Sequence, residues 1–180
     1  TPQSKASMEP SFEPSDTPST EPPQSTEITV SERLSPTISP TMSSHVQTKL
    51  ITSDGAEYDW FGNSVGVYED TVIVGAHGGE SAYVFVRAAA NNWLEQAKLV
   101  ASDGEANNHF GRSVEIYGNT AIVGAPGDSD NGVNSGSAYI FVRDAAKNWI
   151  EQPKLLPDDG EANDAFGWSV GIYNDTMIVG

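Results

Sequence analysis

The chain has 180 residues and no cysteine, which excludes a disulfide scaffold, a zinc ribbon and thiol catalysis. It carries 25 acidic and 9 basic residues, a formal net charge of −16, so it lacks the basic surface with which proteins bind nucleic acid or anionic membranes. No apolar stretch approaches the roughly 18 to 20 residues that span a bilayer, and no signal peptide opens the sequence, which starts at Thr1 and stops within a strand pattern. We therefore expect a fragment of a longer protein, with no membrane insertion of its own.

Residues 1–45 differ in composition from the rest of the chain. Eight of the 11 prolines lie at or before Pro40, whereas all 17 glycines lie at or beyond Gly55. With few large apolar side chains, this segment buries too little surface to offset the entropy of ordering, so we expect a disordered tail. Its Pro, Ser, Thr and Glu content fits either a generic linker or an O-glycosylated stalk.

Residues 46–180 are built from a repeated sequence. The dipeptide Phe-Gly recurs at 61–62, 110–111 and 166–167, with spacings of 49 and 56 residues. The seven extra residues fall between Gly124 and Ser137, and the segments outside that loop align without a gap. Self-similarity at this period indicates one structural unit per repeat.

Each repeat contains four segments with the pattern of β-strands. In the first repeat they are 64–68, 71–76, 81–87 and 93–100, and a two-residue turn at 69–70 joins the first pair as a hairpin. The middle segments are continuously apolar, the first is rich in small residues, and the last is polar.

This gradient predicts an all-β fold, a partial β-propeller of four-stranded antiparallel blades. Radially stacked sheets bury their middle strands on both faces, crowd the innermost strand at the axis and expose the outermost one to water. A β-solenoid is the competing architecture, although its rungs are usually shorter than this repeat. The expected divisions are a leading outer strand and loop at 46–60, blades at 61–109 and 110–165, and a truncated blade at 166–180.

The repeat-defining residues resemble the FG-GAP repeat, the blade unit of the integrin α-chain propeller and of many related extracellular proteins. The resemblance covers about three-quarters of the chain and implies a seven-bladed ring, of which the remaining blades would be partners of this segment. The strand at Lys49-Leu50 would then be the last strand of a blade whose other three are absent. The residues that carry the motif are Phe61, Gly62, Gly75, Ala76, Phe110, Gly111, Gly124, Ala125, Pro126, Phe166 and Gly167.

Calcium is the only cofactor that the sequence suggests. Integrin-type repeats often hold Ca²⁺ in an Asp-rich loop between the FG and GAP elements, but here only the short turn at 117–120 lies in that place. The local alternative is the seven-residue insertion, whose oxygen-bearing side chains could supply several ligands around a glycine turn. A polar turn between strands explains the same residues without an ion. The candidate ligands are Asp128, Asp130, Asn131 and Asn134.

An acidic loop precedes each Phe-Gly pair. Because it recurs in every repeat, we expect it to make a structural turn, and a repeated cation site is the minor alternative. Its members are Asp54, Glu57 and Asp59 in the first copy, Asp103, Glu105 and Asn108 in the second, and Asp159, Glu161 and Asp164 in the third.

Catalytic residues are not evident. His45, His77 and His109 do not recur between repeats and have no Ser or carboxylate arrangement around them in the sequence. Trp93 and Trp149 occupy equivalent repeat positions, which favours blade packing over ligand binding. Asn174 begins an N-glycosylation sequon in an expected exposed turn, which is usable only in a secreted chain.

These features predict a non-enzymatic interaction or adhesion module, extracellular or at the cell surface, that binds a protein or glycan partner through the loops of one propeller face. Two alternatives remain open: an accessory propeller domain of a secreted hydrolase or lyase, and a structural matrix component.

Overall fold

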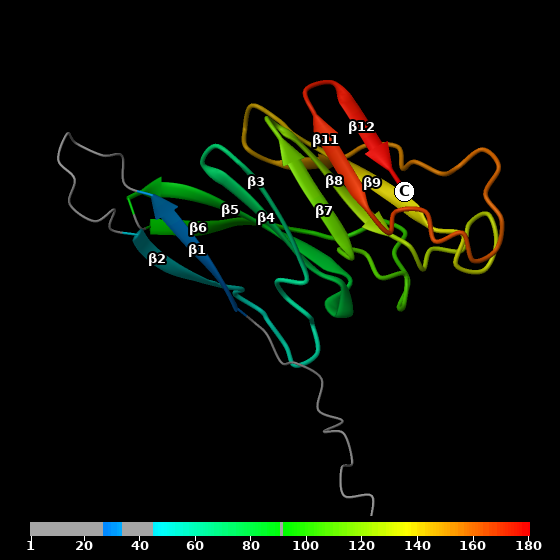
Figure 1. The fold of residues 1–180 in the computed structure, drawn as a ribbon, viewed down its shortest axis with the longest axis horizontal. Coiled ribbons are helices and arrows are strands. Elements are labelled where there is room, and N and C mark those ends of the chain that lie inside the picture. The colour runs from blue at the N-terminus through cyan, green and yellow to red at the C-terminus, as the bar shows by residue number, and fades with distance from the viewer. Residues whose placement is uncertain (1–26, 34–44, 91) are drawn as a thin grey trace, which may run out of the picture.

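The computed structural model describes residues 27–33, 45–90 and 92–180, and these form an all-β structure (Figure 1). Twelve strands and one short 3₁₀ turn account for the regular structure of this part of the chain. Within it, no helix has the length and apolarity needed to cross a bilayer. The predicted linker or stalk at 1–26 and 34–44 lies outside the described residues.

The first complete blade is a four-stranded antiparallel sheet with the predicted strand order. Its strands are β3 (Ser64–Tyr68), β4 (Thr71–Ala76), β5 (Ser81–Ala89) and β6 (Asn92–Leu99), paired in the order β3-β4-β5-β6. The 3₁₀ turn η1 (His77–Gly79) connects β4 to β5. The hairpin between β3 and β4 turns at Glu69, whose φ of 49° lies in the left-handed region.

The second blade repeats this sheet with a shorter outer strand. Its strands are β7 (Ser113–Tyr117), β8 (Thr120–Ala125), β9 (Ser137–Arg143) and β10 (Trp149–Glu151), again paired in sequence order. Pro153 has no N–H to donate, and regular pairing ends before it. A single bridge between Ala138 and Leu155 continues the contact beyond the proline.

A third blade begins with the hairpin of β11 (Val170–Tyr173) and β12 (Thr176–Val179). The innermost strands β3, β7 and β11 lie side by side (Figure 1). Their last residues are tyrosines in contact across the blades, with ring centroids 4.6 Å apart for Tyr68 and Tyr117 and 5.4 Å apart for Tyr117 and Tyr173. The partial propeller predicted from the repeat is therefore confirmed.

One element corrects the predicted domain boundaries. Residues Glu27–Arg33, assigned from composition to the disordered tail, form strand β1, which pairs antiparallel with β2 (His45–Ile51). Leu50 of β2 and Leu99 of β6 are equivalent in the repeat. Leu50 pairs with Ile28 of β1, and Leu99 pairs with Ala82 of β5, the third strand of its blade, so β1 occupies the position of a third strand. The leading strand is thus not alone, because the segment before it supplies its neighbour.

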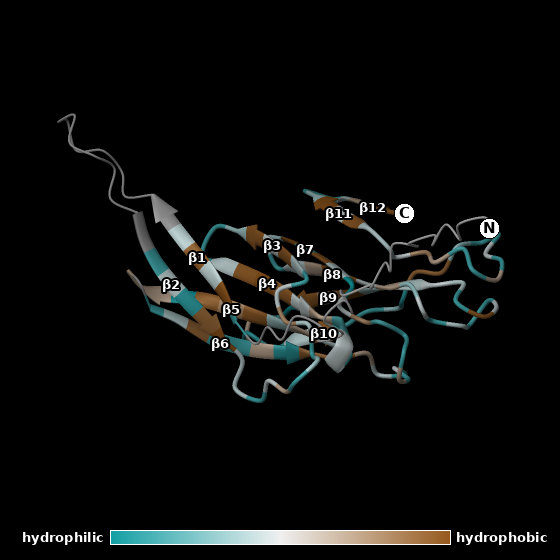
Figure 2. Ribbon diagram, turned by 60° about the horizontal axis from the view of Figure 1, so that its bottom comes forward, coloured by the Kyte–Doolittle hydropathy of each residue, from teal (hydrophilic) through white to brown (hydrophobic). Residues whose placement is uncertain are grey.

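Apolar side chains alternate between two cores on either side of the first blade. From strand β4, Ile73 enters a cluster shared with the second blade, whereas Val72 and Val74 enter a cluster with the β1–β2 hairpin. Figure 2 shows the resulting apolar band along the middle strands β4 and β5. This arrangement explains why middle strands read as continuous apolar runs.

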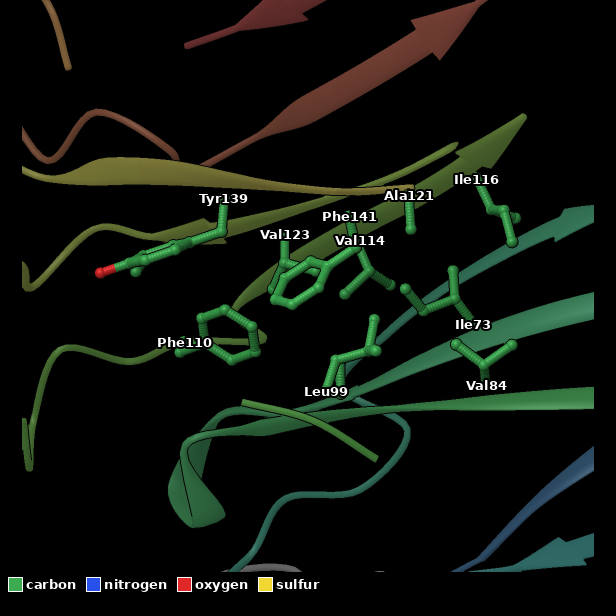
Figure 3. Packing of buried hydrophobic residues seen from close by; sticks show 12 residues of the cluster. Ile73, Val84, Leu99, Phe110, Val114, Ile116, Ala121, Val123, Tyr139 and Phe141 are labelled. Carbon is green, nitrogen blue, oxygen red and sulfur yellow. The ribbon is translucent and has the colours of Figure 1, made fainter. Parts of the chain in front are cut away.

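The core between the two blades is drawn in Figure 3. Phe110 lies at one end of it and packs edge-to-face against Tyr139, with ring centroids 5.2 Å apart. Ile73, Val84 and Leu99 face it from the first blade. The Phe of the Phe-Gly pair therefore anchors the loop that enters each new blade.

Two glycines per repeat are required because backbones of neighbouring blades touch there. Gly111 and Gly167, the second residues of the Phe-Gly pairs, have φ values of 92° and 89°, which side chains rarely adopt. Their carbonyl oxygens lie against Gly75 and Gly124 of the preceding blade, where an added Cβ would overlap them. The carbonyl of Gly167 also accepts a hydrogen bond of 2.8 Å from the Ser113 hydroxyl.

We expect Gly124→Ala to lower the free energy of unfolding by about 3 kcal/mol or more, because the new methyl group must displace the backbone of the next blade. Urea denaturation of both proteins gives the difference. Gly118→Asn is the matched control: Gly118 has φ of 61° with open space around it, and Asn174 holds the equivalent turn position at 56°. Equal stability of Gly124→Ala and wild type would show that the blades do not depend on this contact.

Candidate functional site

The loops at one end of the strands form a continuous layer, which we call the loop end: residues 52–63, 77–80, 100–112, 126–136 and 156–169. Its loops are joined by backbone hydrogen bonds, from Gly78 N to Asp59 O (3.1 Å) and from Gly127 N to Asn108 O (2.9 Å). Within the described residues, the opposite end carries the hairpin turns at 69–70, 118–119, 144–148 and 174–175.

An aspartate, a tyrosine and a lysine meet in both complete blades. Asp54 accepts hydrogen bonds from the Tyr83 hydroxyl (2.9 Å) and from Lys98 Nζ (2.7 Å). Asp103 accepts the same bonds in the second blade, from the Tyr139 hydroxyl (2.8 Å) and Lys154 Nζ (2.7 Å). The lysine bond, then the tyrosine bond, lowers the pKa of Asp54. These partners give the first aspartate of each acidic loop an architectural role.

The second blade adds two carboxylates from the insertion, forming what we call the lysine network: Asp103, Asp128, Asp130, Tyr139 and Lys154. Lys154 Nζ lies 3.2 Å from Asp128 Oδ2 and 2.6 Å from Asp130 Oδ2. Tyr139 donates to Asp128 as well, at 2.9 Å. Burial alone would lower the pKa of Lys154, but hydrogen bonds to its three carboxylates raise it above its ordinary value.

Asp128 is the buried centre of this network. Only 3% of it is exposed, and Oδ2 also accepts a 2.7 Å hydrogen bond from the Ser137 hydroxyl. Burial would raise the pKa of Asp128, but the bonds from Ser137, Tyr139 and Lys154 outweigh it and lower the pKa. Asp128 lies in the insertion, which has no counterpart in the first blade, so sequence repetition alone could not reveal this carboxylate.

The four predicted calcium ligands are only partly brought together. Asp128 and Asp130 both face the Lys154 ammonium, whereas the Asn131 amide donates to Pro157 O at 3.0 Å. Asn134 uses its backbone carbonyl to accept from Ala165 N at 3.0 Å.

Lys154 supplies a positive charge between two of the four predicted ligands, Asp128 and Asp130. In the described part of the chain, no group of three or more His, Cys, Asp or Glu side chains is arranged to hold a metal ion. Calcium binding by the insertion therefore stays a prediction. In the structure, the Lys154 ammonium neutralises these carboxylates instead of an ion.

A polar cleft of about 550 Å³ lies over the network, between the 103–108 loop and the insertion. Its walls carry carboxylates and amides. The lining residues are Asp103, Glu105, Ala106, Asn107, Asn108, Gly127, Asp128, Ser129, Asp130 and Asn134.

The last aspartates of the first and third acidic loops accept hydrogen bonds from backbone N–H groups of their own turns. Asp59 Oδ2 accepts from Ala56 N, and Asp164 Oδ2 accepts from Glu161 N, each at 2.7 Å. These bonds fit the structural interpretation made from the sequence.

The contact between successive loops uses two different chemistries. Glu80 accepts hydrogen bonds from the backbone N–H groups of His109 (3.0 Å) and Phe110 (2.7 Å). In the next blade, carbonyls of the insertion take the place of that carboxylate, since Ser135 O accepts from Phe166 N at 2.9 Å. The seven extra residues therefore replace a side-chain contact with backbone contacts.

Trp93 and Trp149 pack as their repeat positions predict. Trp93 borders the core on the hairpin side and Trp149 the core between blades, each beneath an arginine guanidinium at 5.3 and 5.2 Å. Trp149 Nε1 donates to Gln96 at 3.0 Å.

Sequence reasoning missed a second group of residues at the loop end. Trp60, His77 and His109 form a chain of ring contacts, with centroids 5.8 and 5.7 Å apart. Arg112 lies 4.4 Å from the ring centroid of Trp168. Each of these five residues differs from the residues at the equivalent positions of the other repeats. A comparison of the repeats could have identified the group from these differences.

Asn174 lies where the sequon analysis expected it, exposed in the turn between β11 and β12. Its glycosylation stays a prediction.

The repeated four-stranded sheets, stacked face to face and joined at the loop end, define a β-propeller built from sequence repeats. The sequence model of the FG-GAP repeat matches residues 45–85, 93–141 and 149–180, and the chain belongs to the FG-GAP repeat family. A search of curated proteins found no match.

We expect Lys154→Met to lower the free energy of unfolding by about 3 kcal/mol, because it leaves Asp128 buried and unpaired beside two other carboxylates. Lys98→Met is the matched control in the first blade. It removes a lysine paired with the half-exposed Asp54 and should cost about 1 kcal/mol or less. Urea denaturation with and without calcium measures both. If calcium stabilised the wild type as much as it stabilised Lys154→Met, the carboxylates would bind an ion even with the lysine present. That result would contradict the role given to Lys154.

Acid should weaken the fold through the same network. The pKa of Asp128 is lowered in the folded chain, so its contribution to stability is full above the unfolded pKa of about 3.9 and is lost as pH falls through the folded value. We expect the stability of Asp128→Asn, measured by urea denaturation between about pH 5 and pH 2, to fall less steeply than that of wild type. Parallel curves would contradict this assignment.

Proposed function

We propose that this chain is part of a non-enzymatic interaction module, outside the cell or at its surface, that binds a protein or glycan through the loop end. The observation that carries the proposal is the location of the differences between repeats. The seven-residue insertion, the largest difference between the repeats, lies in the loop end beside a polar cleft, whereas the recurring Phe and Gly residues hold the blades together.

Recurring polar residues are engaged in the architecture. Asp54 and Asp103 each pair with a tyrosine and a lysine of the blade that follows them. Ser53 and Ser102 donate to Glu95 and Glu151 of the next outer strand. Such residues explain why the blades stack, and they leave recognition to other positions.

The positions that differ are exposed in loops. Val133, in the insertion, is 66% exposed, and Trp168 is 57% exposed. Loops on a rigid scaffold tolerate change without loss of the fold, which is why binding residues are commonly found on them. The loop end combines such variation with a polar cleft.

The extracellular assignment rests on chemistry of the sequence. The Pro-, Ser- and Thr-rich segment before the blades has the composition of O-glycosylated stalks, and the Asn174 sequon lies in an exposed turn. An acidic surface without cysteine is compatible with that location.

Attachment of a bulky group to either end of the strands tests the proposal. Because the chain has no cysteine, Val133→Cys and Ala145→Cys each give a single reactive thiol, at the loop end and at the opposite end. Each variant is coupled to a polyethylene glycol maleimide of several kilodaltons and applied to arrays of extracellular proteins and glycans. We expect saturable binding that the polymer at residue 133 blocks and the polymer at residue 145 leaves intact.

Three results would contradict the proposal. Equal blocking by both polymers would place recognition elsewhere, and absence of saturable binding would favour a structural matrix component. Chemical conversion of a bound ligand would indicate that the chain is part of an enzyme.

A further inference from the structure

Five planar side chains form a line across the loop end, which we call the planar row: Trp60, His77, His109, Arg112 and Trp168. The ring contacts Trp60–His77 and His77–His109 join its first part, at 5.8 and 5.7 Å. Arg112 N donates to His109 O at 3.0 Å, and its guanidinium lies over the Trp168 ring at 4.4 Å. The row thus extends from the loop entering the first blade to the loop entering the third.

Backbone geometry fixes where these side chains stand. Trp60 and His109 precede the Phe of their Phe-Gly pairs and have φ values of 57° and 58°, as does Ala165 at 56°. The Trp60 ring lies against Gly78, which has no Cβ to displace it, and His77 opens the same 3₁₀ turn. The row is therefore held by turns that the blades already require, with little side-chain freedom left to lose on binding.

Packing does not account for the row. The equivalent positions carry Ala165 in place of Trp60, Asn63 in place of Arg112, and Pro126 in place of His77, so blades form without these planar groups. Trp168 is 57% exposed, and His109 is also exposed. Exposed aromatic groups gathered in one place mark a binding surface more often than isolated ones do.

Charge around the row excludes a polyanion as its ligand. Arg112 is the cation of the row, whereas Glu80 holds the backbone of His109 and the Asp59 carboxylate lies against Gly79. Burial, then Arg112, then His109 lower the pKa of His77, which favours its uncharged form. With the carboxylates of Glu80 and Asp59 along the row and a net charge of −16 on the chain, an anionic polymer is repelled.

Neutral sugars match both properties of this surface. The C–H faces of a pyranose ring are apolar and flat enough to stack on indole and imidazole rings, while its hydroxyl groups can donate to carboxylates and accept from a guanidinium. A linear chain of sugars can contact successive side chains of a row, as successive bases do on aromatic platforms. Planar side chains also lose little rotamer entropy on binding.

We infer that the planar row binds a neutral polysaccharide chain, with Trp168 as an exposed stacking platform. This inference rests on the proposed function and narrows its partner to one chemical class.

Affinity electrophoresis of the 180-residue chain tests it. Native gels contain hydroxyethylcellulose, galactomannan or laminarin as neutral probes and alginate as the anionic probe. We expect at least one neutral polysaccharide to retard the wild type, Trp168→Ala to weaken that affinity about tenfold, and Trp168→Tyr to keep most of it. Ile150→Ala, at a 48% exposed apolar residue of the outer strand β10, is the matched control and should migrate as wild type. Arg112→Ala should weaken binding as well.

Each other result overturns the inference. Retardation by alginate alone would mean an acidic ligand, and equal retardation of wild type and Trp168→Ala would place the sugar elsewhere. If a protein ligand is blocked by the polymer at residue 133 while no neutral polysaccharide binds, the inference fails and the proposed function stands. If neither assay shows binding, both fail.

Discussion

The structure depends on a contact between backbones of adjacent blades. The carbonyl of the glycine after each Phe lies against a glycine of the preceding blade, as Gly111 does against Gly75 and Gly167 against Gly124. Ser64 and Ser113, the first residues of the inner strands β3 and β7, donate hydrogen bonds to these same carbonyl oxygens, which therefore have a hydrogen-bond partner between the blades. Because no side chain intervenes, the separation and angle of the blades are set by the backbone. The two elements that name the FG-GAP repeat are thus the two sides of one contact.

Side chains then complete an interface that the backbone has positioned. The Phe of each pair fills the end of the core between blades, and apolar residues of the middle strands point alternately into the cores on either side. Farther from the axis, Ser53 and Ser102 donate to glutamates of the following outer strand. The joint between loops is less constrained, since Glu80 serves it in one place and carbonyls of the insertion serve it in the next. Constraint therefore decreases from the Gly–Gly contact toward the loop end.

Sequence analysis predicted the elements that depend on periodicity and not those that depend on contacts between distant segments. Strands β3 and β4 have the predicted bounds because apolar alternation and turn residues define them locally. Strand β1 was missed because Ile28 and Val30 are its only large apolar residues in a Pro- and Ser-rich region, and its partner β2 lies beyond a further segment. The lysine network could not be predicted either. Its members come from four separate segments, and Asp128 and Asp130 lie in the insertion, which the first blade lacks.

The same reasoning explains why the loop end can differ between blades without loss of the fold. A substitution at an exposed position of the loop end, such as Val133, leaves the Gly–Gly contact and the apolar cores unchanged, so its effect on stability is local. Even a buried carboxylate, Asp128, is accommodated, because Lys154 is already present in the repeat pattern to pair with Asp103, and Ser137 and Tyr139 satisfy its remaining acceptor capacity. The first blade keeps the same lysine position with a single carboxylate. A propeller of this kind can therefore acquire charged or aromatic groups at one end while the blades beneath remain the same.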